Sequence, residues 1–261
     1  MRRVRVPPVR REAMRTHLVR ALSKLGLASR SEARSLIAAG RVTVNGRVIR
    51  DALATVNLDR AAIAVDGRAG VPAARVVIAL HKPRGVVTTR RDPEGRPTVY
   101  SLIVEPPVPV VAVGRLDLAT SGLLLFTNDT RFGDWLTDPR SDVPKVYLAT
   151  VRGRVTDDDV AQLAAGVKSN DESLAAAEVR LRKASARESH LVITLTEGKN
   201  REVRRLCASI GHEVTRLRRV QVGGLDLGLL PPGSWRIVED DELARAFPHF
   251  PGFQKHEGTV P

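Results

Sequence analysis

The chain has a single cysteine, Cys207, among its 261 residues. One thiol cannot form an internal disulfide, and this scarcity is typical of proteins from a reducing compartment. Long apolar runs are also missing, since the longest hydrophobic stretches have the length of strands and not of membrane spans. The arginine-containing start, MRRVRVPPVRREAMR, lacks the apolar core of a secretory signal. We therefore expect a cytoplasmic protein that does not contact a membrane.

Motifs for metals and nucleotide cofactors are missing as well. His81 and His212 have no partners at ligand spacing, which argues against a metal site. The chain has no G-x-G-x-x-G or G-K-[ST] loop of the kind that holds dinucleotides or nucleoside triphosphates. Cys207 falls on the apolar stripe of a predicted helix, which favours a core position over a nucleophile. The sequence thus predicts a protein with no metal and no cofactor.

Positive charge is abundant and unevenly distributed. The formal net charge is +13, with 42 Lys and Arg against 29 Asp and Glu. Residues 1–66 hold 14 of these basic residues and 5 of the acidic ones, a surplus of nine in a quarter of the chain. Such a surplus indicates a polyanionic partner, and nucleic acid is the leading candidate. We expect a basic docking module ahead of a nearly neutral working domain.

Residues 17–66 read as a small α/β module. A short helix is predicted over 17–24, and a second begins at the capping-box pattern of Ser29 and Glu32. Two alternating apolar runs around Asn45-Gly46 predict a hairpin, because this pair tolerates the positive φ angles of a type I′ turn. The segment SRSEARSLIAAGRVTVNGRV resembles the S4 domain, an RNA-binding module. The resemblance implies RNA contacts from four arginines: Arg30, Arg34, Arg41 and Arg47.

The rest of the chain predicts an α+β domain with a mixed, mainly antiparallel sheet, because strand and helix patterns do not alternate regularly. Strands are expected at 76–80, 109–113, 123–127, 145–151, 190–196 and 215–222, and helices near 130–137, 157–164 and 200–210. The predicted division is a basic disordered arm (1–16), the S4 domain (17–66), a linker (67–75), a catalytic domain (76–245) and a mobile tail (246–261).

Asp117 is the candidate nucleophile. It lies in VVAVGRLDLATSGLLLFTND, in a polar loop between two apolar strands, at a sheet rim where a carboxylate is both held and reachable. Taken alone, such an aspartate is more often a turn residue. However, GRLDLATSGLLLFTND closely resembles the catalytic motif of pseudouridine synthases, in the branch that acts on ribosomal RNA and usually carries an S4 domain. Four further segments match the family in the same order: HKPRGVVTT, DPEGRPTV, KVYLATV and EGKNREVRRL.

The resemblance implies an isomerase that converts uridine to pseudouridine without a cofactor, with Asp117 as nucleophile. It also implies substrate contacts from Arg115 in the same motif, from Tyr147 as the aromatic residue that stacks on the base, and from Leu217 as an apolar neighbour of the base. Arg204 matches the family's basic position, and its place beside an apolar helix stripe predicts a bidentate pair with Asp117. Arg201 and Arg205 are expected to face RNA or solvent.

Three departures and several alternatives remain open. Glu202 stands where the family commonly has Gln, Leu206 where Met is common, and Thr130 where it usually has Gly. DPEGRPTV favours 23S rRNA and the large-subunit synthase B group, but a small-subunit 16S enzyme has the same catalytic motifs. A non-catalytic ribosome-assembly factor of the S4 type is the main rival, whereas an S4-bearing methyltransferase would need a glycine-rich loop. The expected partner is ribosomal RNA or an assembly intermediate, bound by a monomer.

Overall fold

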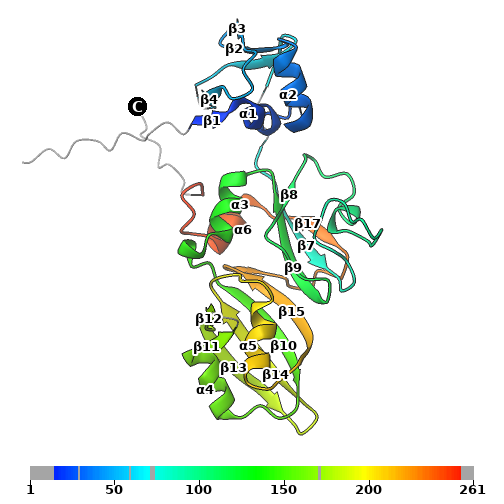
Figure 1. The fold of residues 1–261 in the computed structure, drawn as a ribbon, viewed down its shortest axis with the longest axis vertical. Helices are drawn as coiled ribbons and strands as arrows, with labels where there is room; N and C mark the ends of the chain where they lie inside the picture. The colour runs from blue at the N-terminus through cyan, green and yellow to red at the C-terminus, as the bar shows by residue number, and fades with distance from the viewer. Residues whose placement is uncertain (1–14, 29, 59, 71–73, 170–171, 254–261) are drawn as a thin grey trace, which may run out of the picture. The chain divides into compact units, whose positions relative to one another are not determined.

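The computed structural model describes residues 15–28, 30–58, 60–70, 74–169 and 172–253. The chain divides into two compact units, Met1–Ala74 and Arg75–Pro261. Figure 1 shows the small unit in blue and cyan and the larger unit from cyan to red. In the described part of the chain, no helix is both long and apolar enough to cross a membrane.

The small unit packs two helices against short strands (Figure 1). Its helices are α1 (Leu18–Lys24) and α2 (Arg30–Ala38), and its strands are β1 (Arg15–His17), β2 (Val42–Val44), β3 (Arg47–Val48), β4 (Thr55–Asn57), β5 (Ile63–Val65) and β6 (Arg68–Ala69). Asn45 and Gly46 have φ angles of 50° and 77°, which confirms the predicted hairpin turn. The predicted cap at Ser29 lies outside the described residues.

Both edges of this unit differ from the predicted boundaries. Residues 15 and 16 belong to β1, which pairs with β4, so the part of the predicted arm that the structure describes is a strand. Residues 68 and 69 form β6, which pairs with β5, so this part of the predicted linker completes a four-stranded sheet. Glycine and alanine content suggested a linker, but the Asp66-Gly67 turn returns the chain to the sheet instead.

The larger unit is built on a nine-stranded sheet. Its main strand order is β13-β14-β10-β15-β9-β7-β17, with β16 beside β15 and β8 beside β9. The strands are β7 (Val77–Lys82), β8 (Val111–Val113), β9 (Thr120–Thr127), β10 (Lys145–Arg152), β13 (Glu178–Ala184), β14 (Glu188–Leu195), β15 (Val214–Val222), β16 (Leu225–Asp226) and β17 (Trp235–Ile237); β11 (Val167–Ser169) and β12 (Glu172–Leu174) form a separate hairpin. Among these ladders only β15 and β9 run parallel, which confirms a mixed, mainly antiparallel sheet.

Helices cover this sheet from both ends. They are α3 (Thr130–Thr137), α4 (Asp157–Ala165), α5 (Glu202–Ser209) and α6 (Asp240–Ala246), with 3-10 turns η1 (Val99–Ser101) and η2 (Pro139–Ser141). Figure 1 shows α3 and α6 side by side, and both contribute to one buried cluster with the strands β7 and β9. The opposite faces of β7 and β9 lie in a second cluster, so both faces of these strands bury apolar side chains. A third cluster joins α4 and α5 to β10, β14 and β15.

The segment after α6 is part of the core and not a tail. Phe247 and Phe250 are 1% and 5% exposed, and their rings lie 5.2 Å and 5.0 Å from the ring of Phe132 on α3. The prediction of a mobile tail from residue 246 is therefore wrong as far as residue 253, and residues 254–261 lie outside the described part. The sequence of residues 247–253 has no helical or strand periodicity, because its aromatic side chains reach the core from a backbone that is neither helix nor strand.

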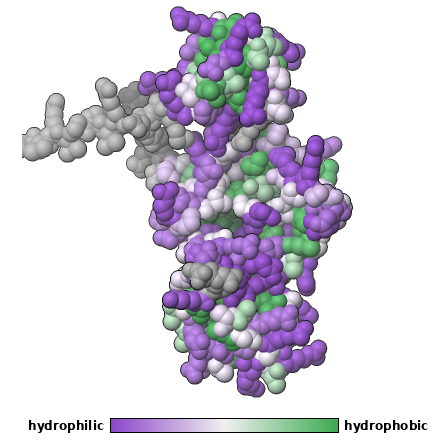
Figure 2. All heavy atoms as spheres, viewed as in Figure 1, coloured by the Kyte–Doolittle hydropathy of each residue, from purple (hydrophilic) through white to green (hydrophobic). Residues whose placement is uncertain are grey.

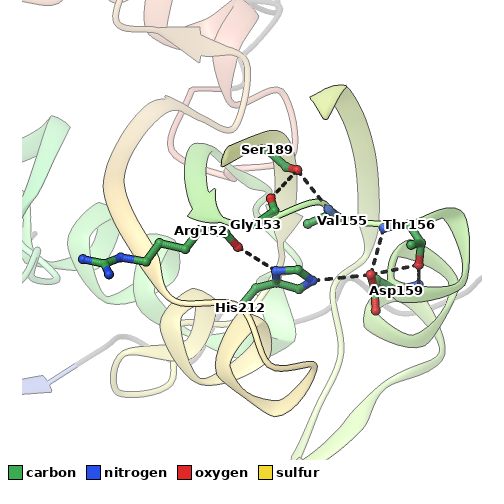
Figure 3. A network of polar contacts seen from close by, with 7 residues as sticks. All are labelled: Arg152, Gly153, Val155, Thr156, Asp159, Ser189 and His212. Carbon is green, nitrogen blue, oxygen red and sulfur yellow. Dashed lines mark hydrogen bonds and ion pairs between the residues drawn. The ribbon is translucent and has the colours of Figure 1, made fainter. Parts of the chain in front are cut away.

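A polar network fixes the end of the sheet that carries α4 (Figure 3). The His212 ring contacts Arg152 O through Nδ1 (2.8 Å) and Asp159 Oδ2 through Nε2 (3.4 Å). Asp159 also completes a capping box with Thr156, as the sequence predicts. Ser189 Oγ donates to Gly153 O and accepts from Val155 N–H, but it does not contact His212 in this network. The group therefore anchors the β10–α4 loop and is not a serine–histidine–aspartate triad.

Candidate active site

Asp117 lies in the turn that joins β8 to β9, as predicted. Its carbonyl accepts from Thr120 N–H at 3.0 Å, which closes the turn. Its side chain is 36% exposed, so the carboxylate is held at the rim of the sheet but remains accessible. This combination suits a group that must attack a substrate.

Lys82, at the end of β7, holds this turn from below. Its side chain is fully buried, and its ammonium donates to Asp117 O (3.0 Å), Thr120 O (2.8 Å) and Pro83 O (3.0 Å). Burial lowers the pKa of Lys82 to about 8, although the negative charge of Asp117 acts in the opposite direction. Sequence reasoning missed this residue, because a lysine that ends an apolar strand usually reaches solvent. The signal was present in HKPRG, directly after the buried run VVIAL.

Gly122 brings the second side of the site close to Asp117. The parallel β9–β15 ladder pairs Gly122 with Arg219 and Thr120 with Leu217. Gly122 has a φ of +112°, and a Cβ at this position would lie 2.1 Å from Arg219 O. Only glycine permits this approach without displacement of one strand. Leu217 lies on β15, the strand next to the Asp117 turn, and its side chain is only 6% exposed.

A cavity of about 440 Å³ opens beside Asp117. Four of the residues that the sequence predicted line it, namely Asp117, Arg115, Tyr147 and Leu217. Tyr147 is half-buried on β10 and packs against two of the hydrophobic clusters, so its ring is held in place. The volume is in the range of small-molecule sites and suits one flipped nucleoside.

The cation that contacts Asp117 is Arg201 and not Arg204. Arg201 Nη1 lies 3.7 Å from Asp117 Oδ2. Arg201 has the left-handed conformation (φ 49°, ψ 34°) at the residue that precedes α5, an uncommon geometry outside glycine that occurs often at functional sites. Arg201 lines the cavity and its side chain is 53% exposed, a position open to solvent or RNA as expected, but its pairing with Asp117 was not foreseen.

Arg204 acts on the backbone around the site. Its guanidinium donates to Val214 O (2.8 Å) and Ala119 O (3.4 Å), the second of which belongs to the Asp117 turn. Burial lowers the pKa of Arg204, and the positive charge of Arg201 adds to this effect. The predicted bidentate pair with Asp117 is replaced by these backbone contacts, because Arg204 lies almost one helical turn beyond Arg201 and faces β15. The remaining stripe of α5 is buried as predicted at Val203, Leu206 and Cys207, and burial raises the pKa of the Cys207 thiol to about 12.

Three further cations, Lys145, Lys199 and Arg219, line the cavity and were missed by sequence reasoning. Arg219 is 7% exposed and donates through Nε to Leu123 O at 2.8 Å. Lys145 donates to Thr196 O at 2.9 Å, and burial lowers its pKa, with a further contribution from the nearby charge of Arg219. Both lie on strands whose apolar neighbours hide them in the sequence. Together they make one wall of the cavity positive, which suits a phosphate-bearing ligand.

The arginines predicted for the small unit have different environments. Arg34 and Arg47 are exposed, and the side chain of Arg30 lies outside the described set. Arg41 is also exposed but forms an ion pair with Asp66 at the β5–β6 turn, and this hydrogen bonding raises the pKa of Arg41. In the face drawn in Figure 2, hydrophilic residues cover most of the described surface and hydrophobic residues appear in separate groups. Among the described residues, no three His, Cys, Asp or Glu side chains are grouped to hold a metal ion.

Known proteins resemble the chain over both units. Residues 76–209 match the family model described as RNA pseudouridylate synthase, and residues 18–57 match the S4 domain. An RNA pseudouridine synthase of Aquifex aeolicus is 38% identical over 235 residues, which cover 90% of this chain and 94% of that protein. The ribosomal large subunit pseudouridine synthase B of Yersinia pestis is 38% identical over 229 residues, 85% of this chain and 72% of its own length.

A solved structure shows the same relationship in three dimensions. A pseudouridylate synthase crystal structure matches with a TM-score of 0.60 at 25% identity, over 88% of this chain and 99% of the other. The family match over residues 76–209 includes the Asp117 turn, β10 and the start of α5, all of which line the cavity, whereas β15 follows the matched segment. The chain therefore belongs to the RNA pseudouridylate synthase family and carries an N-terminal S4 domain.

Proposed function

We propose that this enzyme isomerises a uridine of 23S ribosomal RNA to pseudouridine, with Asp117 as the nucleophile. The observation that carries the proposal is the position of the Asp117 carboxylate, which lies beside Arg201 on a cavity that also contains Tyr147 and Leu217. The carboxylate is thus accessible from the cavity and paired with a cation, which suits a nucleophile.

The reaction replaces the N1–C1′ bond of uridine with a C5–C1′ bond, and the proton on C5 is exchanged for one on N1. The ionised carboxylate attacks the bound uridine, at the ribose or at the base, and the bond between N1 and C1′ breaks. The detached uracil rotates within the cavity, and C5 forms a new bond to C1′. The bond between the nucleoside and the Asp117 carboxylate breaks, which returns the free carboxylate. C5 then loses its proton, while N1 ends with one. No oxidant or cofactor is needed for this balance, so side chains alone are sufficient.

The cavity residues have distinct proposed roles. The ring of Tyr147 replaces part of the stacking that the uridine loses when it leaves the RNA helix. Leu217 gives the other face of the base an apolar contact, and Arg115 binds the adjacent backbone. Arg201 orients the Asp117 carboxylate, while Arg204 and Lys82 hold the Asp117 turn through its carbonyl groups.

The S4 unit is proposed to dock the enzyme on ribosomal RNA through Arg30, Arg34, Arg41 and Arg47. Basic side chains neutralise phosphates and release counterions, so binding should weaken steeply as salt rises. The large subunit is favoured because the Yersinia pestis relative bears the name of a large-subunit synthase. We further propose that the protein acts as a cytoplasmic monomer on free ribosomal RNA or on an assembly intermediate.

The test is a deletion of the gene, followed by carbodiimide mapping of pseudouridines in both ribosomal RNAs. One site in 23S rRNA should disappear, and plasmid-borne wild-type protein should restore it. Asp117→Asn should not restore it, whereas Asp226→Asn, an exposed aspartate on β16, should. Loss of a 16S site instead would assign the small subunit. Full rescue by Asp117→Asn would leave only the role of an assembly factor.

A further inference from the structure

Glu202 is a buried carboxyl group on the cavity wall that the steps above do not use. It is the first residue of α5, its side chain is 3% exposed, and it lines the cavity with Asp117 and Tyr147. Its Oε2 accepts from the backbone N–H of Lys199 at 3.0 Å. Its Oε1 is buried and has no hydrogen-bond donor in the described part of the structure. A buried carboxyl oxygen without a donor is costly while the group is ionised, whereas a protonated oxygen can donate to an acceptor.

A second carboxyl group, Glu197, lies within hydrogen-bonding reach of Glu202. Glu197 is kept ionised by the ammonium of Lys199, whose Nζ lies 2.7 Å from its Oε1. If both Glu197 and Glu202 were ionised at this short distance, they would repel each other, and Lys199 supplies only one positive charge to the pair. Burial, with the adjacent Glu197, raises the pKa of Glu202 to about 7. The pair therefore holds one proton near neutral pH.

The other charged groups around Glu202 do not remove this proton. On β10, Lys145 faces the pair but donates its own hydrogen bond to Thr196 O. On β15, Arg219 donates to Leu123 O through Nε. Lys199 Nζ also donates to Ser173 O at 2.9 Å, so its charge is shared.

We propose that the cavity accepts its uridine only while Glu202 carries a proton, and that Oε1–H then donates to a carbonyl oxygen of the uracil ring. Because Oε2 accepts the Lys199 N–H, Oε1 is the oxygen that bears the proton. Uracil presents two carbonyl oxygens, and a hydroxyl donor is complementary to either. Without RNA the proton is shared with Glu197. An ionised Glu202 would instead oppose the carbonyl oxygen with a negative charge. This inference rests on the function proposed above.

The experiment measures kcat/KM by tritium release from a 23S rRNA transcript that contains 5-tritiated uridine. The range from pH 6.0 to 7.5 is chosen because Lys82, with a pKa of about 8, titrates mainly above it. The wild-type value should fall about fourfold over this range, as the protonated fraction of a group with a pKa of about 7 does. Glu202→Gln places a donor that cannot ionise at the same position, so its fall should be less than 1.5-fold.

Two further variants separate this cause from others. Glu197→Gln removes the charge that raises the pKa of Glu202, so the fall should move to lower pH. Glu178→Gln changes an exposed glutamate on β13 and should keep the wild-type fourfold fall. A fourfold fall that persists in Glu202→Gln would overturn the proposal, and so would a shift to higher pH in Glu197→Gln. Tritium release by the wild-type protein at pH 6.0 tests the proposed function separately.

A binding measurement covers the case in which Glu202→Gln does not fold. The Asp117→Asn protein is titrated with the same transcript at pH 7.5, by calorimetry in two buffers of different ionisation enthalpy. Binding should take up about three quarters of a proton, the fraction of Glu202 that is ionised at this pH. Binding without proton uptake would show that the uridine enters whether or not Glu202 is protonated, and would overturn the proposal.

Discussion

Gly122→Ala should damage both the stability and the activity of the larger unit. The added Cβ would lie 2.1 Å from Arg219 O and 2.6 Å from Arg219 N, whereas ordinary contact begins near 3.4 Å. The ladder between β9 and β15 must therefore open by about 1.3 Å at this point. Backbone atoms on a buried strand cannot move aside as a flexible side chain can.

The free-energy cost has two parts. Alanine at a φ of +112° costs roughly 1–2 kcal/mol, and overpacking of a filled interior typically costs about 1–3 kcal/mol more. We expect the free energy of unfolding to fall by about 2–5 kcal/mol. Because Leu217 pairs with Thr120 in the same ladder, the Asp117 turn and the base-binding strand also move apart. A displacement of about 1 Å at a catalytic site lowers kcat by roughly 10²-fold.

Urea unfolding followed by tryptophan fluorescence measures the first effect, since both tryptophans, Trp135 and Trp235, belong to the larger unit. Tritium release measures the second. Gly211→Ala is the matched control, because Gly211 has a φ of +81° but nothing within 4 Å of its Cβ position. It should lose only the backbone part, about 1–2 kcal/mol. If Gly122→Ala is no more destabilising than Gly211→Ala, the close-approach argument is refuted.

Four other substitutions test the site and the core. Burial holds the pKa of Lys82 near 8 in the folded protein, against 10.5 in the unfolded chain. Between pH 8 and 10.5 the unfolded state therefore binds more protons, and the free energy of unfolding rises with pH. Lys82→Met should remove that rise in urea titrations at pH 8 and 10, and should lower kcat by loosening the Asp117 turn; an unchanged rise would assign it to another group. Arg201→Gln should lower kcat at least tenfold but should change the free energy of unfolding by less than about 1 kcal/mol, because the ion pair with Asp117 is exposed. Arg204→Gln should lower the free energy of unfolding by about 1–3 kcal/mol, because two backbone carbonyls lose their charged donor. Equal stability of these two variants would contradict that division of roles. Phe250→Ala should cost about 3–5 kcal/mol in the same unfolding assay, and a loss under 1 kcal/mol would return this segment to a tail.

Local rules predicted much of the fold from the sequence. The helix at 130–137 has the predicted bounds, and α4 has the predicted Thr156 cap and Gly166 end. These signals are local, because caps and turns depend on residues within one helical turn. The strand β13 was missed, since EVRLRKA alternates with charged residues that face solvent at the sheet edge. Its pairing with β14 stabilises it, and pairing is not a local property.

The candidate site shows the same limit at the level of side chains. Family motifs located Asp117, Tyr147 and Leu217, and all three line one cavity. Helical spacing could not predict whether Arg201 or Arg204 pairs with Asp117. The pairing depends on the left-handed conformation of Arg201 before α5, which arginine rarely adopts. Burial of Lys82 and Glu202 was equally hidden, since charged residues enter a core only where tertiary partners receive them.

The parallel ladder between β9 and β15 also has a consequence for the order of events during synthesis. It joins Thr120 to Leu217, 97 positions later in the chain, and among the described ladders only β7–β17 joins strands that lie farther apart. Contacts at such a distance form late, because the intervening chain must be ordered first. A nascent chain that already displays the Asp117 turn therefore has no base-binding cavity until β15 leaves the ribosome. The enzyme is therefore expected to be inactive during its own synthesis on the ribosome, which contains the class of RNA that it is proposed to modify.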